Sequence, residues 1–170
     1  MKHVTQPRRK AKRAALAALA LGAAASASLA NGGYTYPAGI ACTFPLTISD
    51  DGTGHRVERS FYDRNGNLVR MINNGTGPDL TLTNAYTGAS LTLQGNGANM
   101  LYKPQADGTM LGRTTGHVVL IMFPTDSPPG PTTVLYVGQL VFTYDPNSST
   151  NFTVVQSSSG RKVDICQALS

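Results

Sequence analysis

The chain has 170 residues, of which 41% are hydrophobic and 14% charged, with 18 Gly, 10 Pro and two Cys. This length and composition are typical of one soluble domain and exclude two large ones. The net charge is +5, but six of the 14 basic residues lie within the first thirteen positions. Without residues 1–30 the chain holds eight Lys and Arg against nine Asp and Glu, which argues against nucleic acid as a partner, because phosphate binding needs clustered cations.

Residues 1–30 are predicted to form a signal peptide. A basic stretch reaches Arg13, an apolar run follows over 14–25, and small residues end at Ala30, which is the pattern of a secretory leader. As a helix the run would span about 18 Å, well short of a hydrocarbon core of about 30 Å, so no stable membrane span is expected. Cleavage fits best after Ala30, with Ala27 as the alternative, and the expected localisation is secreted.

The remaining chain is divided into a glycine-rich, extended lead-in at 31–41, which is expected to have no packing of its own, and a single all-β domain at 42–170. Cys42 and Cys166 stand at opposite ends of this domain. Export places the thiols in an oxidising compartment, and two cysteines allow one pairing only. A structural disulfide between Cys42 and Cys166 is therefore predicted.

The domain lacks any apolar pattern of helical period, whereas Val, Leu, Thr, Phe and Tyr alternate between turn dipeptides. A run without polar residues at 118–123 predicts a strand covered on both faces, and Gly138 predicts a bend in a long strand. We expect an antiparallel up-and-down β-barrel of lipocalin-like architecture, with a two-layer β-sandwich as the alternative. Strands are predicted over 43–49, 56–63, 68–73, 79–84, 90–94, 97–103, 109–123, 132–145, 151–157 and 161–165.

Asn65-Gly66 predicts a type I′ hairpin turn, because both residues tolerate a positive φ. This turn fixes a register in which the numbers of the two residues in each cross-strand pair sum to 131. The register pairs Arg59 with Ile72, Phe61 with Arg70, Tyr62 with Val69 and Asp63 with Leu68. Two arginines then share one face with apolar side chains.

That hairpin face supplies the candidate ligand site. Arg59, Phe61, Arg70 and Ile72, together with His117 on a later strand, would hold a small amphipathic anionic ligand if their face points into a cavity. In the competing interpretation this face is exposed and the arginine heads lie in water.

Seven segments cover most of residues 41–169: ACTFPLTISDDG, FYDRNGNLVR, TGPDLTLTN, TGASLTL, RTTGHVVLIMFPTD, TVLYVG and VDICQAL. In these segments the chain resembles a group of small exported all-β proteins of high-GC Gram-positive bacteria that have no assigned activity. The resemblance implies secretion and a shared fold, and it transfers no functional residue.

No catalytic, cofactor or metal motif stands out. Only His55 and His117 follow the leader, so a zinc site would need both with an acid such as Asp50 or Asp51. The G-x-S-x-G elbow of serine hydrolases is absent. We therefore expect a non-catalytic binding or cell-surface interaction module. The alternatives are an extracellular polysaccharide hydrolase, whose carboxylate pair no spacing singles out, and a structural envelope component.

Overall fold

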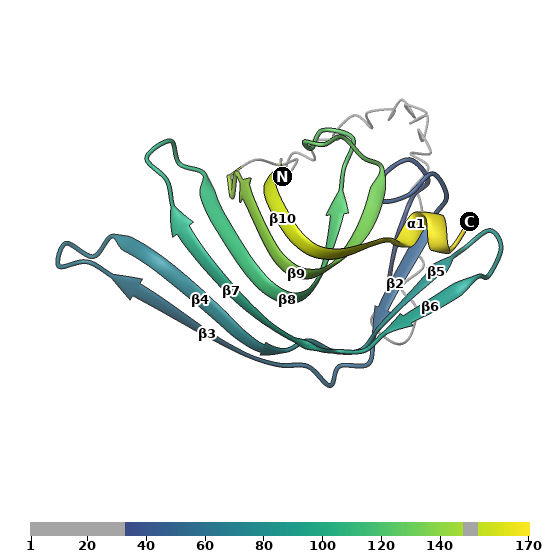
Figure 1. The fold of residues 1–170 in the computed structure, drawn as a ribbon, viewed down its shortest axis with the longest axis horizontal. Helices are drawn as coiled ribbons and strands as arrows, with labels where there is room; N and C mark the ends of the chain where they lie inside the picture. The colour runs from purple at the N-terminus through teal and green to yellow at the C-terminus, as the bar shows by residue number, and fades with distance from the viewer. Residues whose placement is uncertain (1–32, 148–152) are drawn as a thin grey trace, which may run out of the picture.

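The computed structural model describes residues 33–147 and 153–170. The predicted signal peptide at 1–30 lies outside these residues. Ten strands and one helical turn are found in the described part, and the strands form two antiparallel sheets (Figure 1). No helix among the described residues is both long and apolar enough to cross a membrane. The all-β prediction is confirmed.

Each sheet has a simple strand order. The four-stranded sheet runs β1 (Tyr34–Tyr36), β2 (Leu46–Asp50), β5 (Leu80–Asn84), β6 (Ser90–Leu93). The six-stranded sheet runs β10 (Thr153–Asp164), β9 (Thr132–Tyr144), β8 (Met110–Met122), β7 (Gly97–Pro104), β4 (Leu68–Thr76), β3 (His55–Tyr62). The helical turn α1 (Ile165–Ala168) follows β10.

Three chain paths pass from one sheet into the other. β2 leads into β3 through residues 51–54, β4 leads into β5 through 77–79, and β6 leads into β7 through 94–96. β8, β9 and β10 stay in the six-stranded sheet along their whole length and do not continue into the four-stranded sheet (Figure 1). The molecule therefore forks at these three linkers.

A cross-strand row of glycines marks the bend at the fork. Gly75, Gly116, Gly138 and Gly160 lie in this row, with Ala98 between the first two. The four glycines have φ between 92° and 139°. A Cβ on any of them would overlap a backbone carbonyl oxygen of a neighbouring strand. The bend predicted at Gly138 is confirmed, and it extends across the sheet.

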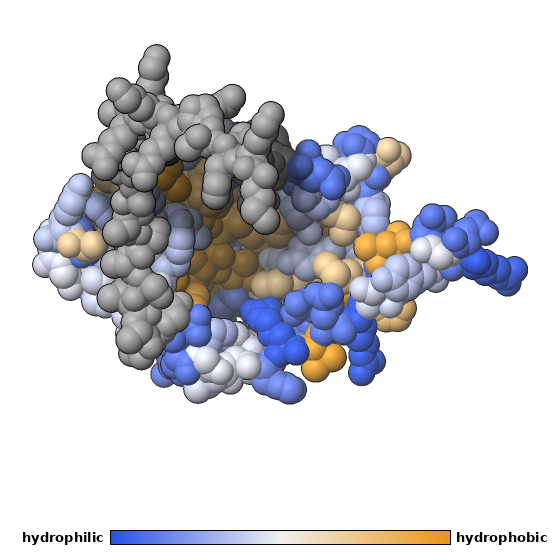
Figure 2. Space-filling view, turned by 180° about the vertical axis from the view of Figure 1, so that it is seen from behind, coloured by the Kyte–Doolittle hydropathy of each residue, from blue (hydrophilic) through white to orange (hydrophobic). Residues whose placement is uncertain are grey.

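The glycine row divides the six-stranded sheet into two arms. The second arm consists of residues 117–122, 132–137 and 161–164, and the rest of the sheet is the first arm. Val118 and Tyr136 of the second arm share one buried cluster with Leu140 and Phe142 of the first arm. The arms thus fold over the inner face of the sheet. Figure 2 shows apolar surface gathered in a hollow with polar side chains around it.

The loop after β8 holds the two arms together. Asp126, which is 5% exposed, accepts hydrogen bonds from the backbone amides of Phe123 (2.6 Å) and Thr153 (2.7 Å). Ser127 forms backbone hydrogen bonds with Thr153 and Val155. Phe123 follows the second-arm end of β8, whereas Thr153 begins β10 at the far end of the first arm. This clasp therefore joins opposite ends of the bent strands.

The outer face of the second arm packs on the four-stranded sheet. Val119 and Ile121 pack against the buried cluster between the sheets, which contains Leu46 and Leu82. Val118 belongs to the other buried cluster, which the two arms share. The run at 118–123 is thus covered on both faces, as predicted. The predicted bond between Cys42 and Cys166 is confirmed: their Cα atoms lie 5.5 Å apart, and both cysteines belong to the cluster between the sheets or pack against it.

The preferred β-barrel is not confirmed, and the two sheets fit the alternative of a two-layer sandwich. In the described residues β3 and β10 remain the edges of the six-stranded sheet. The physical reason is the fork: the interruptions at 51–54, 77–79 and 94–96 divert three strand paths into a second sheet.

Two segments differ from their prediction. The lead-in at 31–41 was expected to have no packing of its own, but β1 pairs with β2 and Tyr36 packs against the core. In place of the strands expected at 151–157 and 161–165, the described residues form one strand, β10 (Thr153–Asp164), because Gly160 allows the chain to bend without leaving the sheet. The start of the first expected strand, at 151–152, lies outside the described residues.

The hairpin register is confirmed for most of its length. Arg59 pairs with Ile72 and Phe61 with Arg70, as predicted. Near the turn the prediction is wrong, because a bulge shifts the pairing and places Tyr62 opposite Leu68 instead of Val69. Asp63 does not pair with Leu68, because its amide donates to the carbonyl oxygen of Asn67 (2.9 Å) and its carbonyl oxygen accepts from the amide of Gly66 (3.1 Å). The turn is therefore centred one residue earlier than the predicted type I′ turn, and the Asp63 carboxylate caps it by accepting hydrogen bonds from the amides of Asn65 and Asn67.

Candidate functional site

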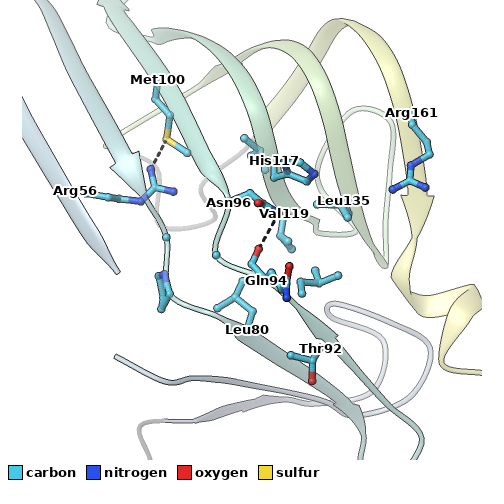
Figure 3. Close-up of a pocket in the computed structure, with 15 residues that line it drawn as sticks. Arg56, Leu80, Thr92, Gln94, Asn96, Met100, His117, Val119, Leu135 and Arg161 are labelled. Atoms are coloured by element: carbon cyan, nitrogen blue, oxygen red, sulfur yellow. Dashed lines mark hydrogen bonds between the residues drawn. The ribbon is translucent and has the colours of Figure 1, made fainter. Parts of the chain in front are cut away.

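A cleft of about 630 Å³ opens where the two sheets diverge (Figure 3). We call it the fork cleft. Its walls come from the linkers at 77–79 and 94–96, from β5 and β6 of the four-stranded sheet, from the second arm, and from Arg56 and Met100 of the first arm. The lining residues are Arg56, Gly77, Pro78, Leu80, Thr92, Leu93, Gln94, Gly95, Asn96, Met100, His117, Val118, Val119, Leu135 and Arg161.

The floor of the fork cleft is apolar. Leu80 and Leu93 face it from one sheet, and Val119 and Leu135 face it from the other. All four pack in or against the core cluster between the sheets. Their orientation follows from strand alternation. The threonines between the leucines point outward, where Thr81 and Thr92 lie within hydrogen-bond distance of each other.

Two aspartates fix the linkers that form the walls. Asp51 accepts hydrogen bonds from the amides of Thr53 (3.1 Å) and Asp79 (3.0 Å), and Asp79 accepts one from Gly95 (2.6 Å). Hydrogen bonds from the amide and hydroxyl of Thr53 lower the pKa of Asp51 below its ordinary value, because they favour the ionised carboxylate. A Cβ on Gly95 would overlap the carbonyl oxygen of Gly77, so the linkers cross in close contact.

Two arginines and a histidine border the apolar floor. Figure 3 shows Arg56 at one end, His117 in the middle and Arg161 at the other end. His117 and Arg161 both pair with Val137, so two strand spacings, about 10 Å, separate their backbones. Within the described residues neither arginine forms an ion pair with a carboxylate. Their donors are available to an anionic ligand.

Arg56 makes two contacts of its own. Its Nη1 atom lies 3.5 Å from Oδ1 of Asn73 and 3.6 Å from Sδ of Met100. Both contacts are exposed, and a neutral amide and a thioether leave the charge of the guanidinium uncompensated. The fork cleft therefore joins an apolar floor to unneutralised positive charge.

The structure separates the residues predicted from the sequence. Arg59, Phe61, Arg70 and Ile72 are neighbours on the outer face of the first arm, where both arginines are exposed. The Arg70 guanidinium carbon lies 4.2 Å from the centre of the Phe61 ring. His117 lies in the fork cleft instead. The five residues do not form one site.

Sequence reasoning missed Arg56 and Arg161. Arg56 stands in the hairpin on the face opposite to Arg59, and Arg161 stands in a short polar stretch of β10. No local pattern distinguishes either residue. They line the same cleft as His117 because the sheets diverge at this point.

No cluster of three or more His, Cys, Asp or Glu side chains in the described part of the chain could hold a metal ion. The lining of the fork cleft holds no carboxylate, serine or cysteine among these residues. The lining thus combines apolar side chains with amide, imidazole and guanidinium groups.

No family model, no curated protein and no solved structure matches this chain.

Proposed function

We propose that the protein is a secreted, non-catalytic binding module that holds a small amphipathic anion in the fork cleft. The observation that carries this proposal is the apolar floor bordered by two arginines without a carboxylate partner. A volume of about 630 Å³ falls in the range of small-molecule sites.

The chemistry of the lining indicates how such a ligand would lie. Its hydrocarbon part would cover Leu80, Leu93, Val119 and Leu135, and its acidic head would bind Arg161. A guanidinium group holds a carboxylate or phosphate with two parallel hydrogen bonds. The length of the cleft between Arg161 and Arg56 (Figure 3) favours an elongated ligand with one acidic end.

Titration calorimetry with decanoate tests this function. Arg161→Ala should weaken decanoate binding about tenfold, because one charge-assisted hydrogen-bonded contact is lost. Decanol, which has the same chain and no charge, should bind the wild type more weakly than decanoate and should not respond to this substitution.

Arg64→Ala is the matched control, because Arg64 is an exposed arginine in the hairpin turn outside the cleft lining. It removes the same charge and should leave decanoate binding unchanged. Equal effects of Arg64→Ala and Arg161→Ala would show that net charge, and not the fork cleft, governs binding.

A further inference from the structure

The outer face of the first arm carries half of the basic residues of the described chain. Arg59, Arg70, Lys103 and Arg113 are all exposed there. Register places Arg59 and Arg113 in one cross-strand row, three strands apart, which is about 14 Å. Arg70 and Lys103 line a shallow cavity of about 550 Å³ with Phe61. We call the surface formed by Arg59, Arg70, Lys103 and Arg113 the basic face.

The carboxylates of the protein are committed elsewhere. Eight of the nine carboxylates accept a hydrogen bond from a backbone amide. The ninth belongs to Glu58, which lies opposite Asn73 in the strand register and so points to the inner side of the sheet, away from the basic face. The eight are Asp50, Asp51, Asp63, Asp79, Asp107, Asp126, Asp145 and Asp164. In the described residues no cation of the basic face forms an ion pair. Its charge is available to a partner.

Neutral polar side chains border the basic face. Asn74, Asn99, Thr115 and Gln139 form the adjacent cross-strand row, and all four are exposed. Amides and hydroxyls both donate and accept hydrogen bonds. This row therefore suits a ligand that carries hydroxyl groups beside its anionic groups, as an acidic polysaccharide does. A lipid surface does not present hydroxyls and anionic groups in alternating rows.

The shape of the face also favours a chain molecule. The outer face is the convex side of the bend, because the buried cluster shared by both arms lies on the other side. A flat membrane would touch a convex sheet over a small area only. Ile72 and Leu101, which lie between Arg59 and Arg113, are half-buried. The exposed apolar side chains on this side of the sheet include Val57 and Val69, which are 46% and 51% exposed. They stand well apart along the hairpin and do not form a continuous apolar patch for a bilayer. An extended polymer can follow the curvature.

We infer that the basic face binds a linear acidic polysaccharide. Arg70 and Lys103 would hold one anionic group in the shallow cavity, with Arg70 already positioned by its contact with the Phe61 ring. Arg59 and Arg113 would bind anionic groups further along the polymer. The neutral row would bind hydroxyls of the sugars between them. This surface lies outside the fork cleft.

Two double variants with the same change in charge test the inference. Binding of a heparin decasaccharide and of a polygalacturonate oligosaccharide is measured in low salt for Arg70→Ala with Lys103→Ala, and for Arg56→Ala with Arg161→Ala. The first variant should lose at least tenfold in affinity for both oligosaccharides. The second should stay within about twofold of the wild type, and neutral dextran should not bind to any of the three proteins.

Other results would overturn the inference. Equal losses in the two double variants would show that net charge alone attracts the oligosaccharides. Tighter binding of anionic vesicles or of a DNA duplex that depends on Arg70 and Lys103 would assign the face to a different partner. Thermal unfolding of each variant confirms that it is folded. Decanoate binding to the Arg70→Ala, Lys103→Ala protein separates a failure of this inference from a failure of the fork cleft.

Discussion

At the scale of single residues, the cost of substituting a glycine depends on the space beside its Cα atom as well as on its backbone conformation. Gly108 and Gly138 both have a positive φ, of 87° and 137°. Nothing lies within 4 Å of a Cβ built on Gly108, which sits in an exposed turn. A Cβ on Gly138 would overlap the carbonyl oxygen of Ser159 in β10. The first position demands a backbone conformation, and the second also demands the absence of a side chain.

Gly138→Ala should therefore cost about 3 kcal/mol of unfolding free energy, since backbone strain adds to a clash that the paired strand cannot relieve. Urea unfolding measures this loss. Gly108→Ala serves as the control, with an expected cost of about 1 kcal/mol from its φ alone. Similar losses in both variants would contradict the role of close strand contact at the glycine row.

At the scale of elements, β8, β9 and β10 are bent strands whose curvature needs support at both ends. The glycine row permits the bend, and the clasp through Asp126 holds it. A buried carboxylate that accepts hydrogen bonds from two backbone amides stabilises this arrangement, because both bonds are lost together when the carboxylate is removed. The exposed edge strand β3 carries charged side chains, Arg56, Glu58 and Arg59 among them, and charges of this kind discourage pairing with another chain.

Asp126→Ala should lower the unfolding free energy by about 3 kcal/mol, because it removes two hydrogen bonds of a buried carboxylate, one from the amide of Phe123 and one from the amide of Thr153. Chemical unfolding measures the change. Asp107→Ala, in an exposed turn where the carboxylate bonds Thr109, should cause a much smaller loss. If the two variants unfold alike, the clasp does not hold the arms together.

At the scale of the whole molecule, the disulfide ties the start of the domain to its end. Cys42 and Cys166 are separated by 124 positions, and both lie at the core between the two sheets. Closing a loop of this size stabilises a fold by about 5 kcal/mol in the chain-entropy model. The bond restrains the segment before β2 and the turn α1, which together cover one end of that core.

The protein collected from culture medium should begin near Asn31 and contain no free thiol, because we propose that it is exported through a cleaved leader. Intact mass before and after reduction measures both properties at once. Reduction should also lower the melting temperature by several degrees or more. A mass that includes residues 1–30, or two thiols that react without reduction, would disagree with this expectation.

The sequence by itself determined the properties that depend on local chemistry. Alternating apolar residues predicted the strands, Asn65-Gly66 predicted the hairpin and the pairing of Arg59 with Ile72, and two cysteines left one disulfide to form. The outward threonines and inward leucines of β5 and β6 follow from the same two-residue period. The strands and the hairpin depend only on residues that are close in sequence. The disulfide could be predicted because two cysteines allow one pairing only.

Only the tertiary structure decided where the sheets separate and which side chains meet at that point. The linkers at 51–54, 77–79 and 94–96 look like ordinary turns in the sequence, yet they carry three strand paths from one sheet into the other. Arg56, His117 and Arg161 come from three strands far apart in the chain, and no spacing relates them. Their meeting depends on cross-strand register and on the bend at the glycine row, which are set by long-range packing and not by local sequence.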